Sequence, residues 1–88
     1  MAKLTFTEHG WEDYIFWQSK DSKTLKKINK LLKEVQRTPF DGTGKAEPLK
    51  CKNADAWSRR INKKDRLVYV VTDDNVLIVQ CKGHYDDK

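Results

Sequence analysis

The fold of this chain is decided by residues 57–71, which read WSRRINKKDRLVYVV. Two runs of strand-forming residues flank the polar link 62–65, and this pattern is typical of an antiparallel hairpin. In the second run, Leu67, Tyr69 and Val71 point to one face and Arg66 to the other, because successive side chains of a strand alternate. The hairpin also carries five basic residues: Arg59, Arg60, Lys63, Lys64 and Arg66. We therefore expect it to form the centre of the sheet and of the functional site.

Length and charge limit the kind of protein. The 88 residues allow a single domain, 1–88, with one modest core. The formal net charge is +5 and 35% of the residues are charged, which favours an anionic partner. Basic residues gather between Lys45 and Arg66, whereas the segment from Glu8 to Asp21 is net acidic. One basic side on a small domain is typical of a protein that binds nucleic acid or an acidic protein.

The two cysteines, Cys51 and Cys81, follow no secretory signal and no apolar leader. Every apolar run is far shorter than the ~20 residues that a membrane span needs. We therefore expect a reduced, cytoplasmic protein with two free thiols. The two histidines and two cysteines are scattered without metal-ligand spacing, so we expect no metal and no cofactor.

The first half of the chain predicts a short strand and two helices. Residues 4–7 alternate as a strand does, and Thr7 suits the N-cap of a helix with Glu8 in its first turn. The helical repeat of Trp11, Tyr14, Ile15 and Trp17 favours core packing, with a partner surface as the alternative for Trp11 or Trp17. Asp21 or Ser22 caps a second helix, which ends before Pro39. Its apolar stripe is Leu25, Ile28, Leu31, Leu32 and Val35.

The second half predicts an antiparallel sheet. The loop 41–45 holds two glycines and a lysine but lacks the spacing of a phosphate-binding loop, which excludes a nucleotide-triphosphate site of that kind. Residues 47–50 look like an edge strand because Pro48 is tolerated there. A turn at 73–75 leads to the last strand. There Leu77, Val79 and Cys81 form an apolar face, expected against the helices, and the opposite face holds Ile78, Gln80, Lys82 and His84. The fold class is α+β, with the helices on one side of the sheet.

The face away from the helices has the groups that RNA cleavage requires. By strand parity it collects Arg66, His84 and Arg60, with Glu47 and Lys50 nearby if the edge strand joins the sheet. Cleavage within RNA uses the neighbouring 2′-hydroxyl as nucleophile, so the protein supplies a base, an acid and cations. The residues alone leave other interpretations open: His84 as an ordinary surface residue, Glu47 as a strand-edge carboxylate, and the whole as a basic nucleic-acid-binding domain.

Four segments resemble the YoeB/Txe toxins of bacterial toxin–antitoxin pairs, in the RelE/ParE superfamily. They are GKAEPLK at 44–50, WSRRI at 57–61, RLVY at 66–69 and CKGHY at 81–85. The resemblance implies a fold like that of microbial ribonucleases and metal-independent cleavage of translated mRNA in the ribosomal A site. It implies that Glu47 is the general base, Arg66 the transition-state-stabilising arginine and His84 the general acid. Three further residues would bind RNA: Lys50, Arg60 and Tyr85.

The same resemblance implies partners. These are an acidic, partly disordered antitoxin of the Phd/YefM type, the ribosome and mRNA, with a toxin dimer left open. A ParE-like gyrase inhibitor without enzymatic activity is an alternative, although it would need neither an acid nor a base. This chain departs from the family pattern at Lys82-Gly83, which would loosen the strand before His84, and in the extension 86–88.

Overall fold

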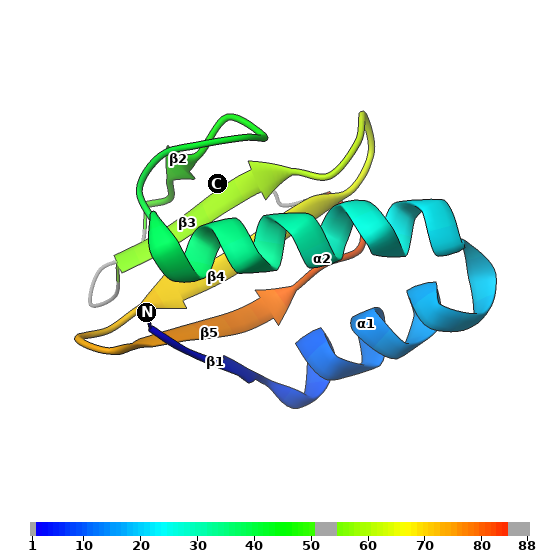
Figure 1. Ribbon diagram of the computed structural model, residues 1–88, viewed down its shortest axis with the longest axis horizontal. Helices are drawn as coiled ribbons and strands as arrows, with labels where there is room; N and C mark the ends of the chain where they lie inside the picture. The colour runs from blue at the N-terminus through cyan, green and yellow to red at the C-terminus, as the bar shows by residue number, and fades with distance from the viewer. Residues whose placement is uncertain (1, 51–54, 85–88) are drawn as a thin grey trace.

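The computed structural model describes residues 2–50 and 55–84. It consists of two helices and one five-stranded sheet, so the predicted α+β class is confirmed (Figure 1). The elements in chain order are β1 (Lys3–Phe6), α1 (Glu8–Lys20), α2 (Ser22–Arg37), β2 (Glu47–Pro48), β3 (Asp55–Arg60), β4 (Arg66–Val71) and β5 (Asn75–Gln80). In Figure 1 α2 runs across one face of the sheet, and α1 lies near the end of β5.

The sheet order is β1-β5-β4-β3-β2. The predicted hairpin forms its centre: β3 and β4 pair antiparallel from Asp55 opposite Val71 to Arg60 opposite Arg66. The edge position of β2 is also confirmed. β1 pairs with β5 in the parallel direction, so the sheet is mixed rather than wholly antiparallel.

Side chains at the helix starts cap the backbone as the sequence indicates. The hydroxyl oxygen of Thr7 accepts a hydrogen bond from the backbone N–H of Gly10 at 3.0 Å. Asp21, and not Ser22, is the N-cap of α2, because its carboxylate accepts from the N–H groups of Lys23 and Thr24, both at 3.1 Å. Each cap satisfies donors that a helix start leaves without an intrahelical partner.

The core lies between the helices and the sheet. The predicted stripe of α2 is confirmed: Ile28, Leu31, Leu32 and Val35 are buried, and Leu25 packs against them. Of the aromatic residues of α1, Trp17 is buried, but Trp11 is 49% exposed and stacks on Tyr14 at the surface. The core-packing prediction is therefore right for Trp17 and wrong for Trp11, and it is also wrong for Ile15, which is 41% exposed.

The predicted faces of the last strand are partly wrong. Val76 and Ile78 are fully buried, whereas Leu77 and Val79 are only partly buried. Tyr69 lies opposite Ile78 while the preceding Val68 lies opposite Gln80, so β5 contains one extra residue, a β-bulge. A bulge breaks the two-residue alternation of a strand. Cys81 therefore reaches the core as predicted, although it shares that face with Ile78 rather than with Leu77 and Val79.

Helix α1 is packed closely on the end of β5. A Cβ atom added to Gly10 would lie 2.4 Å from the carbonyl oxygen of Ile78, so only glycine allows this approach. The indole N–H of Trp17 donates to the carbonyl of Cys81 at 2.7 Å, and the backbone N–H of Cys81 donates to the buried carboxylate of Asp13 at 3.1 Å. These contacts fix where the chain leaves β5. Neither helix is long and apolar enough to cross a membrane.

Candidate active site

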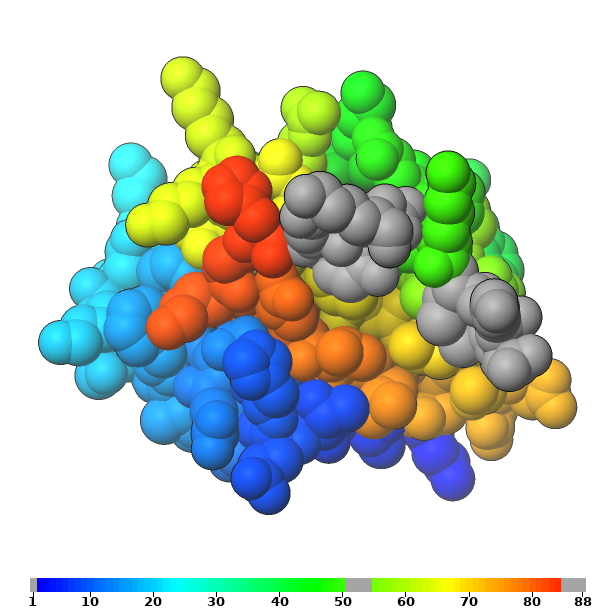
Figure 2. Space-filling model, turned by 180° about the vertical axis from the view of Figure 1, so that it is seen from behind, coloured from blue at the N-terminus to red at the C-terminus, as the bar shows by residue number. Residues whose placement is uncertain are grey.

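Strand pairing brings several of the predicted site residues to the face of the sheet opposite α2, which is the face seen in Figure 2. Pairing across the strands aligns Glu47 with Ser58, and Ser58 with Val68. Arg60 lies opposite Arg66 at the end of the same hairpin. Side chains of residues directly opposite each other in an antiparallel pair point to the same face, and alternate residues share it. Glu47, Arg60 and Arg66 therefore come from three different strands to one face.

The guanidinium of Arg66 lies over the β3–β4 turn. Its Nη1 donates to the carbonyl of Asn62 at 2.8 Å, and more weakly to the carbonyls of Asp65 at 3.2 Å and Lys63 at 3.4 Å. Its Nε and Nη2 make no hydrogen bond to any residue that the structure describes. That edge of the guanidinium presents two parallel N–H donors, through which arginine can bind two phosphate oxygens at once.

His84 lies beside Arg66 because Gly83 is bound on both sides. The backbone N–H of Arg66 donates to the carbonyl of Gly83 at 3.0 Å, and the N–H of Gly83 donates to the carboxylate of Asp65 at 2.7 Å. The side-chain amide of Gln80 donates to the carbonyls of Gly83 at 3.1 Å and His84 at 3.2 Å. Gly83 has a φ of 86°, which an L-amino acid side chain disfavours. Rather than loosening this segment, Gly83 forms a turn that holds His84 next to Arg66, with the imidazole exposed.

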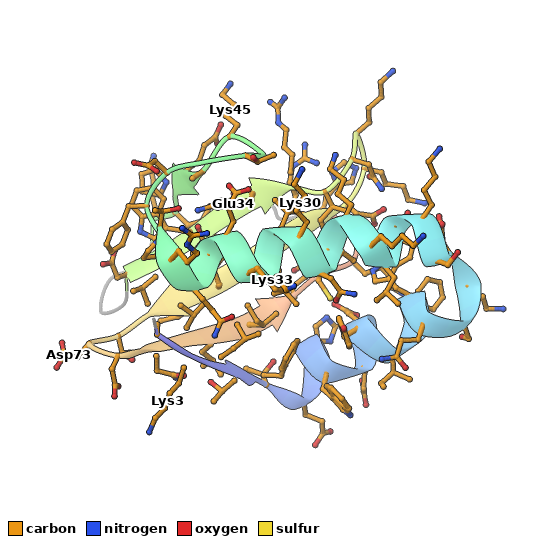
Figure 3. All side chains as sticks on the ribbon, viewed as in Figure 1. Lys3, Lys30, Lys33, Glu34, Lys45 and Asp73 are labelled. Atoms are coloured by element: carbon orange, nitrogen blue, oxygen red, sulfur yellow. The ribbon has the colours of Figure 1, made fainter. Side chains whose placement is uncertain are left out.

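Glu47 lies at the exposed edge strand. One of its carboxylate oxygens is 3.8 Å from Nζ of Lys45, and both side chains are largely exposed. The backbone N–H of Arg60 donates to the carbonyl of Gly44 at 2.7 Å, which joins this segment to β3. Figure 3 shows Lys45 on the segment that leads into β2. Lys50 is exposed just beyond β2, where the N–H of Leu49 donates to the carbonyl of Ala56. Tyr85 lies outside the described residues.

Arg59 is a buried arginine that supports the site from the other face. Its guanidinium forms an ion pair with Glu34 at 2.9 Å, and Figure 3 shows Glu34 projecting from α2. It also donates to the carbonyls of three residues, Thr38, Asp41 and Thr43. The hydrogen bond from the backbone N–H of Thr43 contributes most to keeping the pKa of Glu34 below its usual range. The positive charge of Arg59 lowers that pKa further. Arg59 thereby fixes the connection between α2 and β2, and with it the position of Glu47.

A buried tyrosine completes this network. Nε of Arg59 donates to the hydroxyl of Tyr69 at 3.1 Å, and that hydroxyl donates to the carbonyl of Pro39 at 2.6 Å. Burial raises the pKa of Tyr69, so the phenol stays protonated and keeps donating at neutral pH. The core tyrosine predicted from strand alternation thus also holds the end of α2.

Sequence reasoning missed Asp65, Gln80 and the structural role of Arg59. A signal existed for each of them. Residues 62–65 begin with Asn and end with Asp, and such side chains often form hydrogen bonds with the backbone of the turn in which they lie. Here Oδ1 of Asn62 accepts hydrogen bonds from the backbone N–H groups of Lys64 and Asp65. Gln80 is an amide that follows the apolar run 76–79 of β5. Arg59 has the parity of the core face, where a charged group needs a partner.

Taken together, the open face offers the carboxylate of Glu47 and the guanidinium groups of Arg60 and Arg66, and the exposed His84 follows Gly83, which is bound to Arg66. Carboxylate and imidazole are the usual groups of general acid–base catalysis, and the guanidinium groups suit a phosphate. The described residues contain no cluster of three or more His, Cys, Asp or Glu side chains that would hold a metal ion. These are the kinds of group that general acid–base cleavage of RNA through its own 2′-hydroxyl requires.

Comparison with known proteins finds similar sequences and structures over nearly the whole chain. The family model described as a YoeB-like toxin of bacterial type II toxin–antitoxin systems matches residues 6–85. Toxin YoeB of Escherichia coli K12 is 53% identical over 83 residues, which cover 94% of this chain and 99% of that protein. The YoeB dimer of Staphylococcus aureus superposes with a TM-score of 0.86 at 45% identity, covering 96% of this chain and 98% of that one. The heterotetrameric YoeB–YefM toxin–antitoxin complex of Staphylococcus aureus gives a TM-score of 0.84 at 44% identity, covering 97% and 99%.

Proposed function

Because the chain belongs to the YoeB-like toxins of bacterial type II toxin–antitoxin systems, we propose that it is a ribosome-dependent mRNA endonuclease that inhibits translation in the cytoplasm. The observation that supports this most is the double hydrogen bonding of Gly83, which ties the backbone just before His84 to Asp65 and Arg66. Glu47 approaches the same face from β2. An acid, a base and a phosphate-binding cation then border one open surface.

The reaction follows from these three groups. Glu47, as a carboxylate, takes the proton of the 2′-hydroxyl, and the 2′-oxygen attacks the adjacent phosphorus. The bond from phosphorus to the 5′-oxygen breaks, and protonated His84 donates a proton to that oxygen. The products are a 2′,3′-cyclic phosphate and a 5′-hydroxyl. The Nε and Nη2 edge of Arg66 neutralises the charge that grows on the phosphorane oxygens, with Arg60 and Lys50 as further cations. Tyr85 is proposed as an additional contact to the substrate.

An antitoxin of the YefM type is the proposed partner, since the related Staphylococcus aureus protein forms a YoeB–YefM complex. An acidic segment that folds over the basic face would neutralise it and cover the site. The related YoeB dimer supports self-association of this chain as well. The aromatic cluster of Phe6, Trp11 and Tyr14, which leaves Trp11 49% exposed, offers an apolar surface for such a contact.

The test is primer extension on a defined message in a purified translation system. Wild-type protein is expected to cut at the A-site codon, and His84→Ala is expected to reduce the rate of cutting by about 10²–10⁴-fold, the usual contribution of a general acid. Glu47→Gln and Arg66→Lys should also reduce it, because the first removes the base and the second removes the planar fork while keeping the charge.

A second histidine of the chain provides a control for the His84→Ala variant. His9 is the other histidine; it lies on α1 and pairs with Asp13 at 3.5 Å. His9→Gln should cut like the wild type. If a folded, antitoxin-free wild type leaves the message intact, the nuclease proposal is wrong, and DNA damage that depends on gyrase would then point to ParE-like inhibition.

A further inference from the structure

A basic cleft lies beside the candidate active site. It occupies about 440 Å³ between the end of α1, the β3–β4 turn and the segment that follows β5. Its lining includes Phe16, Trp17, Lys20, Lys64, Lys82 and Gly83. This volume falls within the roughly 300–1,000 Å³ of small-ligand sites. In Figure 2 the yellow-green turn and the blue α1 flank the orange-red end of the described chain.

The three lysines of the cleft have no acidic partner among residues 2–50 and 55–84. Lys20, Lys64 and Lys82 are exposed, and none of them forms an ion pair with another residue in the described parts of the chain. The two carboxylates of the cleft are engaged by other groups. Asp21 caps α2, and Asp65 accepts from Gly83 and from the amide of Asn62. Asp65 is buried, and both carboxylates accept hydrogen bonds from neighbouring groups of the protein, so the three exposed ammonium groups are the groups of the cleft that are available to bind an anion.

Two aromatic side chains, Phe16 and Trp17, line the cleft beside these lysines. Nζ of Lys82 lies 4.1 Å from the centroid of the Phe16 ring, a cation–π contact that holds the ammonium at the rim. Phe16 packs edge-on against Trp17 with ring centroids 5.2 Å apart. Proteins that bind single-stranded nucleic acid combine such cations, which follow the phosphates, with aromatic rings that contact the bases.

We propose that this cleft binds single-stranded RNA next to the scissile phosphate, with Lys20, Lys64 and Lys82 on backbone phosphates and Phe16 against a base or sugar. This inference rests on the proposed nuclease function and extends it to the nucleotides that flank the cut. The cleft includes Gly83, which directly precedes His84. A strand whose phosphate reaches His84 therefore has its neighbouring nucleotides beside the cleft. This continuity favours RNA over an acidic protein segment.

The test compares two double variants that remove equal charge. Lys20→Gln/Lys64→Gln alters the cleft, while Lys3→Gln/Lys33→Gln alters exposed lysines elsewhere. Lys3 lies at the opposite end of the sheet, where its N–H bonds to Asp74, and Figure 3 shows both control lysines. Binding of a fluorescent 2′-O-methyl RNA oligonucleotide, which lacks the nucleophile and so stays intact, is measured by anisotropy across a salt series.

We expect the cleft variant to bind about tenfold more weakly, with the slope of log K against log salt smaller by about 1.4, the value for two lost phosphate contacts on a single strand. The control variant should stay within about twofold of the wild type. Lys82→Arg, which keeps the charge and the ring contact, should bind normally, and Lys82→Met should bind less well. Equal weakening by both double variants, or none by the cleft variant, would overturn the proposal.

Two more measurements distinguish RNA from an acidic protein as the ligand of the cleft, and a failure of the cleft proposal from a failure of the nuclease proposal. A polyglutamate peptide is titrated against the same proteins; loss of peptide binding with unchanged RNA binding would assign the cleft to an acidic protein and overturn the proposal. The same preparations are assayed for mRNA cleavage. A wild type that does not cut contradicts the nuclease function, whereas a cutting wild type with cleft and control variants that bind and cut alike contradicts the cleft alone. Thermal melting of each variant verifies that it is folded.

Discussion

The carboxylate of Asp65 accepts a hydrogen bond of 2.7 Å from the backbone N–H of Gly83. The next residue, Arg66, donates its own N–H to the Gly83 carbonyl at 3.0 Å. Both backbone groups of one glycine are thus bound by two consecutive residues, Asp65 at the end of the β3–β4 turn and Arg66 at the start of β4. Asp65 is buried, and its other oxygen accepts from the side-chain amide of Asn62 at 3.0 Å. The relative position of Arg66 and His84 therefore depends on this carboxylate.

We expect Asp65→Asn to weaken this connection. The substituted NH₂ group would face one of the two donors, either the Gly83 N–H or the Asn62 amide, and an unmet buried hydrogen bond costs about 1–3 kcal/mol. If that free energy reflects displacement of His84, the cleavage rate falls about tenfold to hundredfold. NMR hydrogen exchange of the Gly83 amide should become faster by a similar factor.

A matched control is Asp73→Asn. Asp73 lies exposed in the β4–β5 turn at the other end of the sheet, as Figure 3 shows. It should leave both the cleavage rate and the exchange of Gly83 unchanged. Unaltered Gly83 exchange in Asp65→Asn would contradict the positioning role.

Gly10→Ala is expected to destabilise the protein although alanine is the better helix former. Helix propensity favours alanine by about 1 kcal/mol. The new methyl group, however, would lie 2.4 Å from the carbonyl oxygen of Ile78, a backbone atom that cannot move away alone. Overpacking of this kind costs about 1–3 kcal/mol, so we expect a net loss of up to about 2 kcal/mol in urea unfolding. Gln18→Ala, at an exposed position of α1, should not destabilise; an equally stable Gly10→Ala would mean that α1 shifts freely on β5.

The ion pair of Glu34 and Arg59 predicts a pH dependence of stability. The hydrogen bond from Thr43 and the charge of Arg59 lower the pKa of Glu34 from its ordinary 4.5. A carboxyl with a lowered folded-state pKa stabilises fully above its unfolded pKa, and that contribution is lost as the pH falls through the folded value. Urea unfolding should therefore show Glu34→Gln less stable than wild type at neutral pH, with a smaller difference near about pH 3. A constant difference across this range would contradict the assignment.

The thiol of Cys81 is expected to be unreactive in the folded protein. Burial, together with the Asp13 and Asp65 carboxylates, raises its pKa to about 12, and only the thiolate is a good nucleophile. In a Cys51→Ser background, iodoacetamide should fail to label Cys81 at mildly alkaline pH and should label it in guanidinium chloride. An added exposed cysteine, Ser19→Cys, reports reactivity under the same conditions. Labelling of Cys81 as fast as that of the added cysteine would contradict its burial.

Local patterns in the sequence predicted the elements of the fold well. The 62–65 link, the Thr7 cap and the α2 stripe each depend on residues close together in the chain, and the structure confirms them. The faces of β5 were predicted wrongly for a non-local reason. The extra residue opposite the step from Val68 to Tyr69 arises from pairing between strands, and the alternation of β5 alone does not reveal it.

The candidate site likewise has features that local sequence patterns predict and features that depend on contacts between distant residues. Strand parity brought Arg60 and Arg66 to one face, as the pairing of β3 with β4 does. The nearness of His84 to Arg66, by contrast, depends on Asp65 and Gln80, whose side chains bind backbone groups 18 and three to four residues away. Residue type alone does not specify such contacts, because a turn aspartate and a strand glutamine usually face solvent. The roles of Glu47, Arg66 and His84 in cleavage stay predictions.

The parallel pairing of β1 with β5 bears on how the protein is made. Residues 3–6 are synthesised first, yet their neighbours in the sheet are residues 75–78. On a translating ribosome β1 therefore has no strand to pair with until β5 is made. The indole N–H of Trp17 likewise has no Cys81 carbonyl to donate to. Contacts between distant parts of a chain form late in folding. The hydrogen bond between Arg66 and Gly83, which brings His84 to the candidate site, therefore forms only after residues 75–84 have emerged, later than the pairing of β3 with β4.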